Sequence, residues 1–368
     1  MGKASTNADL HAAKKSKQDD FYTQLPDVEK ELKFHKKNVR NKTVICNCDD
    51  PRVSNFFHYF SYNFEQLKLK KLISVCYKNN QTDLFSQNKN EKAVFLEYTG
   101  DKNGDNKPNL EEIDVLPLKG DGDFRSEESI NLLKKSDIVI TNPPFSLFRE
   151  FLDQTINYNK KFLILGNVNA ISYKEVFKLI MENKVWLGAS IHSGDREFGV
   201  PRDLETRSKS LRVDENGNKF IRVPGIRWFT NLDYKQRHED LILYKKYTPE
   251  EYPKYDNYDA INVNITKEIP MDYDGIIGVP ITFLSKYNPD QFEILGLSQK
   301  VGYGLKSTKF YDDYEEKRQD GTKTGSSGKK TNGNAVLAGR PKKGNFYTRG
   351  NDVVHSLYGR IFIRNKRL

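Results

Sequence analysis

The fold of this chain can be inferred outward from the run DIVITNPPFS, residues 137–146. Residues 137–141 form an apolar run of strand length, and Ser146 is placed to cap a helix whose apolar side chains recur over 147–156. The two prolines between them lack a backbone N–H and cannot continue either element. The run therefore predicts a strand, a stiff turn and a helix in direct succession.

Similar units repeat along the chain on both sides of this turn. Further strands are expected at 43–48, 72–77, 93–98, 113–118, 162–165 and 185–187, and further helices at 54–64, 129–135 and 173–181. Alternation of strands and helices is typical of a parallel sheet covered by helices. The sequence thus predicts an α/β fold with a doubly wound, Rossmann-like sheet of seven strands.

The pattern changes after the hairpin signal Asn216-Gly217. Strands are expected at 220–223, 226–230 and 241–244 with no helix between them, which predicts an antiparallel edge. Further apolar runs follow at 276–284, 292–297 and 356–364. We therefore expect a flexible tail at 1–18, a catalytic domain at 19–248 and a second lobe at 249–368 that contains a basic loop at 317–350.

The composition is that of a basic globular protein. Hydrophobic residues make up 36% and charged residues 30%, and the formal charge is +10. Such a charge favours a polyanionic partner, because lysine and arginine displace counterions from phosphates, although a merely basic protein fits equally well. The three cysteines lie in strand-like runs, so we expect buried thiols in the cytoplasm, with no disulfide and no metal site. No apolar stretch reaches the roughly 20 residues that span a bilayer, so we expect no membrane segment.

The turn after the 137–141 strand carries groups suited to methylating a planar amine. The N6 amine of adenine is a weak nucleophile, since its lone pair is delocalised into the ring. The side-chain oxygen of Asn142 and the carbonyl of Pro143 can accept its two hydrogens, while Pro143 and Pro144 keep the turn rigid. Phe145 can stack on a base turned out of the double helix. The alternative is a proline-rich turn that merely ends a strand.

Acidic residues at two other strand ends are candidate cofactor ligands. Asp123 follows the run that ends near Leu118 and can accept a hydrogen bond from the amine of an adenine ring. Asp49, Asp50 and Pro51 follow the first strand, where doubly wound folds bind nucleotides. Neither loop is a glycine-rich dinucleotide fingerprint. A solvated turn at Asp123 and a helix cap at Asp49 or Asp50 are the alternatives.

Aromatic and basic residues later in the chain suggest contacts with nucleic acid. Phe229 is a candidate second aromatic wall beside a flipped base, although core packing is the commoner role. The glycine-interrupted segment 317–350 carries Phe346 and Tyr347 among its charges, which favours binding to DNA over a solvated loop. The basic residues expected to contact DNA are Lys323, Lys329, Lys330, Arg340, Lys342, Lys343 and Arg349.

Several motifs together resemble a known family. They are DFYT (20–23), CNCDDP (46–51), TNPPFS (141–146), GIRWFTN (225–231), IPMDYDG (269–275) and VHSLYGRIF (354–362). On these motifs the chain resembles the EcoRI-type adenine-specific DNA methyltransferases over nearly its whole length.

This resemblance implies a Rossmann-like catalytic lobe that uses S-adenosyl-L-methionine, followed by a C-terminal target-recognition lobe. It implies N6-methylation of a flipped-out adenine in double-stranded DNA. The site would be a palindrome such as GAATTC, which a cognate restriction endonuclease shares without having to bind this chain. Phe21, Tyr22 and Thr23 match the segment that borders the methionine part of the cofactor, and Asp123 matches the acidic residue near its adenine.

Two features leave other interpretations open. The first loop has Asp-Asp-Pro in place of the usual glycines, and no acid ends the second strand at Tyr77, so the ribose contact is unassigned. The same Asn-Pro-Pro-Phe turn would also suit an RNA or protein-glutamine methyltransferase. A non-enzymatic DNA-binding protein with a relict cofactor fold is a third alternative.

Overall fold

The computed structural model of the chain describes residues 21–48, 54–76, 93–105, 108–109, 112–202, 204, 209–298 and 303–368. The expected tail at 1–18 and the loop of Asp49, Asp50 and Pro51 lie outside these residues. The chain divides into two compact units. The first comprises residues up to Ala170 together with Leu187–Tyr234, and the second comprises Ile171–Trp186 and Lys235–Leu368.

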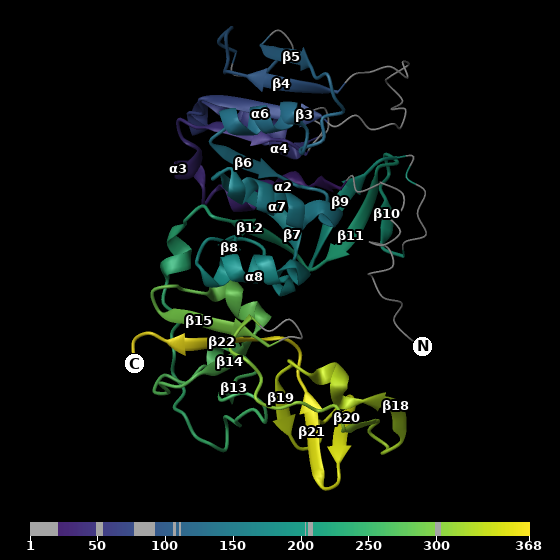
Figure 1. Ribbon diagram of the computed structural model, residues 1–368. Helices are drawn as coiled ribbons and strands as arrows, with labels where there is room; N and C mark the ends of the chain where they lie inside the picture. Colours follow the sequence, from purple (N-terminus) through teal and green to yellow (C-terminus); the bar gives the residue numbers. More distant parts are fainter. Residues whose placement is uncertain are drawn as a thin grey trace. The chain divides into compact units, whose positions relative to one another are not determined.

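An eight-stranded mixed sheet forms the centre of the first unit (Figure 1). In spatial order its strands are β5 (Ile113–Pro117), β4 (Val94–Tyr98), β3 (Lys71–Cys76), β2 (Thr43–Cys46), β6 (Ile138–Thr141), β7 (Lys161–Asn167), β12 (Ile226–Thr230) and β8 (Trp186–Leu187). The four central strands, β3, β2, β6 and β7, are parallel, whereas β4, β5 and β12 pair antiparallel with their neighbours. The α/β class is confirmed, but the expected count of seven strands is wrong because β12 joins the sheet between β7 and β8.

Helices cover this sheet because its central strands are apolar on both faces. Strands β2 and β6 are buried at every position, which is typical of the interior of a parallel sheet. The helices of this unit are α2 (Leu25–Leu32), α3 (Lys36–Val39), α4 (Asn55–Tyr62), α5 (Phe64–Leu67), α6 (Glu127–Lys135) and α7 (Phe148–Asn157). Helix α4 packs against β3, α6 against β2 and α7 against β7. The Ser54 hydroxyl begins α4 by accepting hydrogen bonds from the backbone N–H groups of Phe56 and Phe57.

The helix after the double proline starts later than expected. A 3-10 turn, η1 (Phe145–Leu147), comes first, because the N–H of Leu147 donates to the carbonyl of Pro144 at 2.9 Å. Helix α7 then begins at Phe148, with Leu147 at its N-cap. The prediction that Ser146 caps this helix is therefore wrong, since Ser146 lies inside the 3-10 turn.

A second, antiparallel sheet in the same unit joins the start of the described chain to a hairpin. Its order is β1 (Tyr22–Thr23), β9 (Asp195–Val200), β11 (Lys219–Pro224) and β10 (Leu211–Val213). Figure 1 labels the last three of these strands. Val213 and Lys219 pair across the hairpin, and Gly217 takes the left-handed φ of 77° that its turn requires. The hairpin predicted at Asn216-Gly217 is confirmed.

The second unit contains two five-stranded sheets and helix α8 (Lys174–Met181). One sheet has the order β13 (Ile261–Asn262), β14 (Ile277–Pro280), β22 (Arg360–Asn365), β15 (Phe292–Leu297) and β16 (Tyr303–Gly304). The other has the order β18 (Lys323–Ser327), β17 (Glu315–Lys317), β20 (Phe346–Arg349), β21 (Asp352–Ser356) and β19 (Val336–Ala338).

Two expectations for this unit are wrong. The segment 317–350 is folded rather than a loop, because its strands bury Phe346 and Tyr347 while its lysines remain outside. The strand expected at 241–244 does not form, because the backbone of Leu241 bonds to the side chain of Gln291 and Ile242 is 83% exposed. No helix among the described residues is long and apolar enough to cross a membrane.

Candidate active site

The candidate site lies at the carboxyl ends of two neighbouring parallel strands, β2 and β6. From these two strands the chain continues in opposite directions along the sheet. After β2 the chain continues to β3, whereas after β6 it continues to β7 on the other side. Open α/β sheets bind ligands beyond the carboxyl ends of such a strand pair. Asn47 and Cys48 follow β2, and Asn142 to Phe145 follow β6. The backbone N–H of Cys48 donates to the Thr141 hydroxyl at 3.2 Å and joins the two strand ends.

Asn142 is buried and connects this point to the start of the described chain. Its side-chain Nδ2 donates to the carbonyl of Phe21 at 2.6 Å, across 121 positions of sequence. This bond sets which way the amide group points. The following prolines leave the backbone little freedom, so the side chain and the carbonyl of Pro143 keep one mutual arrangement.

Three phenyl rings, Phe21, Phe145 and Phe198, form an aromatic cluster beside Asn142. Phe21 and Phe145 are stacked, with ring centroids 5.6 Å apart and planes inclined by 23°. Phe198, on β9, contacts each of them edge-on at 5.9 Å. Sequence analysis missed Phe198, although the alternation in DREFGV (195–200) could have indicated a strand with Phe198 on its buried face.

Phe229 does not belong to the aromatic cluster. It is fully buried in β12, and its ring centroid lies 5.0 Å from that of Phe148. A flipped base cannot stack on a ring enclosed in the core, so the prediction of Phe229 as a second aromatic wall is wrong. Core packing is its role.

Two buried polar groups lie near the same strand ends, one on β1 and one directly after β2. Asn55 donates to the carbonyl of Thr23 at 2.7 Å and so anchors the strand that also carries Tyr22. Thr23 Oγ1 and Asn47 Oδ1 are buried and have no hydrogen-bond partner among the residues that the structure describes. Buried polar atoms are nearly always paired, so these two are suited to meet polar groups of a ligand.

Asp123 lies close to the first turn of α7. The Arg125 guanidinium donates to both of its carboxylate oxygens, at 2.9 and 2.6 Å, and also to Glu150 at 3.1 Å. These hydrogen bonds lower the pKa of Asp123 below its usual range, against an opposing effect of partial burial. The carboxylate is therefore ionised and can accept a further hydrogen bond.

Four of the basic residues expected to contact DNA are engaged within the second unit. Lys323 pairs with Glu315 at 2.7 Å, and Lys330 pairs with the buried Glu316 at 2.5 Å. Arg349 pairs with Asp313 at 3.0 Å, and Arg340 lies over the ring of Phe346 at 4.6 Å.

The remaining three, Lys329, Lys342 and Lys343, are exposed and form no ion pair with a described residue. Phe346 and Tyr347, whose presence among the charges of 317–350 favoured DNA binding in the sequence, are buried. Within the described ranges, no group of three or more His, Cys, Asp or Glu side chains is arranged to hold a metal ion.

Comparison with known proteins identifies the group to which this arrangement belongs. Residues 9–366 match a family model described as adenine-specific methyltransferase EcoRI. The chain belongs to this family. It is therefore an enzyme, an adenine-specific DNA methyltransferase of the type II restriction-modification class.

Three curated relatives agree with this assignment. Type II methyltransferase M.EcoRI of Escherichia coli is 56% identical over 303 residues, which cover 82% of this chain and 92% of the relative. M.MgeORF184P of Mycoplasma genitalium is 42% identical, covering 78% of this chain and 85% of that protein. M.MpnI of Mycoplasma pneumoniae is 40% identical, covering 78% and 84%. No solved structure matches the chain.

Proposed function

We propose that this enzyme transfers the methyl group of S-adenosyl-L-methionine to the N6 amine of an adenine flipped out of double-stranded DNA. Residues 19–248 would form a Rossmann-like catalytic domain, and 249–368 would form a target-recognition lobe. The parallel strands β3, β2, β6 and β7 support the first assignment.

The observation that carries the proposal is the hydrogen bond from Asn142 to the carbonyl of Phe21. Because the amide NH2 is directed to that carbonyl, the amide oxygen is the atom of this side chain that accepts from adenine N6. The Pro143 carbonyl accepts the second amine hydrogen, and Pro144 keeps the turn stiff. Two acceptors favour a more tetrahedral nitrogen and stabilise the positive charge that develops as N6 attacks.

The cofactor assignment rests on polar groups that still lack partners. Thr23 and Asn47 present buried oxygens that fit the ammonium and carboxylate groups of a methionine moiety. Phe21 and Tyr22 would border the same moiety, and Asp123 would accept from the amine of the cofactor adenine. Asp49, Asp50 and Pro51 remain candidate ligands at the end of β2. S-adenosyl-L-methionine supplies an electrophilic methyl group.

Phe145 would stack on the flipped adenine. Phe21 covers one part of its ring and Phe198 supports it edge-on, so the ring is oriented before any base arrives. A pre-oriented aromatic face offsets part of the free energy that unstacking the base requires.

The basic residues proposed for DNA binding would divide into two groups. Lys329, Lys342 and Lys343 are positioned to neutralise phosphates, since they form no ion pair with a described residue. Lys323, Lys330, Arg340 and Arg349 would contribute chiefly by maintaining the fold of the second unit, because their partners already hold them.

The similarity to M.EcoRI supports GAATTC as the recognised site. The enzyme would then act in the cytoplasm as the modification partner of a restriction endonuclease that shares the site but need not bind this chain.

The test is transfer of radiolabelled methyl from S-adenosyl-L-methionine to duplex oligonucleotides. One duplex contains GAATTC, and the others each carry one changed base pair. Label in N6-methyladenine of the intact site alone is the expected result. Label in RNA or protein but not in duplex DNA would favour the alternative acceptors, and salt-dependent DNA binding without turnover would favour a relict fold.

A further inference from the structure

The second unit exposes an aromatic ring on a loop that is otherwise well anchored. Phe310, between β16 and β17, is 65% exposed. Single exposed apolar residues are common on protein surfaces and need no explanation by themselves. Phe310 differs from most such residues because polar contacts fix the residues around it. The loop therefore holds its ring in an exposed position.

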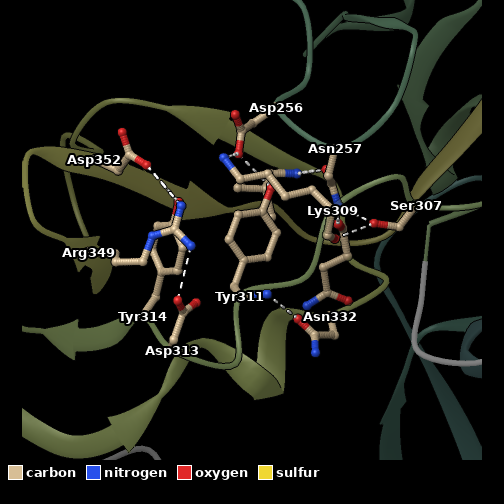
Figure 2. Close-up of polar contacts among 12 residues, drawn as sticks. Asp256, Asn257, Ser307, Lys309, Tyr311, Asp313, Tyr314, Asn332, Arg349 and Asp352 are labelled. Carbon is tan, nitrogen blue, oxygen red and sulfur yellow. Dashed lines mark hydrogen bonds and ion pairs between the residues drawn. The ribbon is translucent and has the colours of Figure 1, made fainter.

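The two neighbours of Phe310 in sequence bind the same carboxylate. Lys309 Nζ lies 2.8 Å from Asp256 Oδ2, and the Tyr311 hydroxyl donates to that oxygen at 2.8 Å (Figure 2). The hydrogen bond with Asp256 raises the pKa of Lys309, so its ammonium stays charged. Both neighbours are bonded to Asp256, whereas the side chain of Phe310 is exposed to solvent.

Further hydrogen bonds fix the backbone on both sides. The N–H of Thr308 donates to the carbonyl of Asn257 at 2.9 Å, and the Ser307 hydroxyl donates to the carbonyl of Lys309 at 2.8 Å. The N–H of Tyr311 donates to Asn332 Oδ1 at 2.8 Å, as Figure 2 shows. A ring held on such a loop loses little conformational entropy when it meets a partner.

A cationic turn packs directly against this loop. The N–H of Gly328, at the start of the 3-10 turn η6 (Gly328–Thr331), donates to the carbonyl of Tyr314 at 2.7 Å. The fit is so close that a Cβ on Gly328 would clash with the carbonyl of Tyr311. The turn carries Lys329, which is exposed and forms no ion pair with a described residue. The loop thus carries an exposed aromatic ring, and the turn packed against it carries an exposed lysine. Nucleic-acid-binding surfaces combine aromatic and cationic groups in this way.

We propose that Phe310 inserts its ring at a base step of the duplex DNA substrate while Lys329 contacts a neighbouring phosphate. The inference rests on the proposed function, which makes duplex DNA the partner of the second unit. Apolar side chains that enter a base step unstack it and bend the duplex. The aromatic contact of this unit is thus the exposed Phe310, since Phe346 and Tyr347 are buried.

The experiment measures the affinity of the full-length enzyme for a fluorescent GAATTC duplex at several salt concentrations. Phe310→Ala should weaken binding about 5- to 150-fold, the range that stacking free energies of about 1–3 kcal/mol produce. Its salt dependence should match that of the wild type, because no charge is lost. Lys329→Ala should instead lower the slope of log affinity against log salt by about one. Phe310→Leu keeps an apolar wedge and should bind more tightly than Phe310→Ala.

Tyr62→Ala is the matched control, since it removes a ring of similar exposure, 62%, from helix α4. This variant should bind as the wild type does. Duplexes with 2-aminopurine near the site report unstacking directly, and their fluorescence increase with the wild type should fall in Phe310→Ala. Wild-type methylation of DNA combined with Phe310→Ala affinity within twofold of the wild type would overturn this inference alone. Failure of the wild type to bind or methylate the duplex would overturn the proposed function with it.

Discussion

Replacing Asn142 separates two effects that the structure assigns to one side chain. Asn142→Ala removes the acceptor proposed for adenine N6 and also the 2.6 Å hydrogen bond to the carbonyl of Phe21. Loss of one charge-stabilising hydrogen bond in a transition state lowers kcat about 10²- to 10³-fold. The unpaired Phe21 carbonyl should lower the free energy of unfolding by about 1–3 kcal/mol, with a fall of about 2–4 °C in Tm for each kcal/mol.

Asn55→Ala supplies the control for the structural part of this change. Asn55 makes a similar bond, 2.7 Å from its Nδ2 to the carbonyl of Thr23, and so anchors the same strand without lying at the Asn-Pro-Pro-Phe turn. The free energy of unfolding of Asn55→Ala should fall by a similar amount, whereas the rate of methyl transfer of this variant should fall only a few-fold. Single-turnover transfer at saturating S-adenosyl-L-methionine measures the chemical step, and calorimetry measures both cofactor binding and unfolding.

Two outcomes of comparing Asn142→Ala with Asn55→Ala would refute the role proposed for Asn142. If Asn142→Ala transfers methyl within tenfold of the wild-type rate, the amide oxygen is not the N6 acceptor. If Asn55→Ala loses as much activity as Asn142→Ala, the effect comes from displacement of strand β1, and the chemical role assigned to Asn142 fails.

Three further predictions concern acid stability, the core and phosphate contacts. Burial opposes ionisation of Glu316, but hydrogen bonds from Lys330 and other partners outweigh burial and lower the pKa of this carboxyl from 4.5 to about 2. The stability that the ionised carboxylate contributes above pH 4.5 should therefore be lost as the pH falls towards 2. Urea unfolding at a series of pH values should show this loss, and the loss should be smaller in Glu316→Gln. Phe229→Ala should lower the free energy of unfolding by about 3–5 kcal/mol in denaturant titrations while 2-aminopurine fluorescence still reports base flipping. Replacing Lys342 and Lys343 by alanine should reduce the salt slope of DNA binding by about two, whereas Lys330→Ala should chiefly destabilise the fold.

Each of these has a distinct contrary outcome. Equal acid sensitivity of Glu316→Gln and the wild type would show that this carboxylate does not govern acid stability. If Phe229→Ala protein remains folded but no longer flips the base, Phe229 would contact the flipped base after all. An unchanged salt slope after the double lysine replacement would place the phosphate contacts elsewhere in the chain.

The central sheet was predictable because a strand that is buried on both faces is a continuous apolar run in the sequence. Strands β2 and β6 are continuous apolar runs, and their partners follow at the spacing of strand and helix alternation. In the second unit, β14, β15 and β22 overlap the apolar runs at 276–284, 292–297 and 356–364, whereas β17 and β18 contain no such run. Strand β18 (KTGSS) has no apolar alternation, and cross-strand partners such as Glu315 for Lys323 help to hold it. Such pairing depends on side chains of the neighbouring strand and cannot be inferred from the pattern within one strand.

The candidate site was predictable where its chemistry lies in one short motif. Asn142 and Phe145 are separated only by Pro143 and Pro144, so the sequence alone indicated that both lie at one turn. Phe198 comes from another sheet, and only the pairing of β9 with β1 brings it to Phe21. Phe229 was misassigned because an aromatic residue in a strand looks the same in sequence whether its ring faces a pocket or the core.

The aromatic cluster also imposes an order on synthesis. Phe21 emerges early from the ribosome, but its stacking partner Phe145 and the ring of Phe198 follow more than a hundred residues later. Strand β1 has no sheet to join until β9 has been made. A nascent chain or a fragment that stops before Phe198 therefore carries the Asn-Pro-Pro-Phe turn and Phe21 but lacks the edge-on ring of Phe198 and the strand with which β1 pairs. The aromatic cluster should therefore assemble only when just over half of the protein has been made.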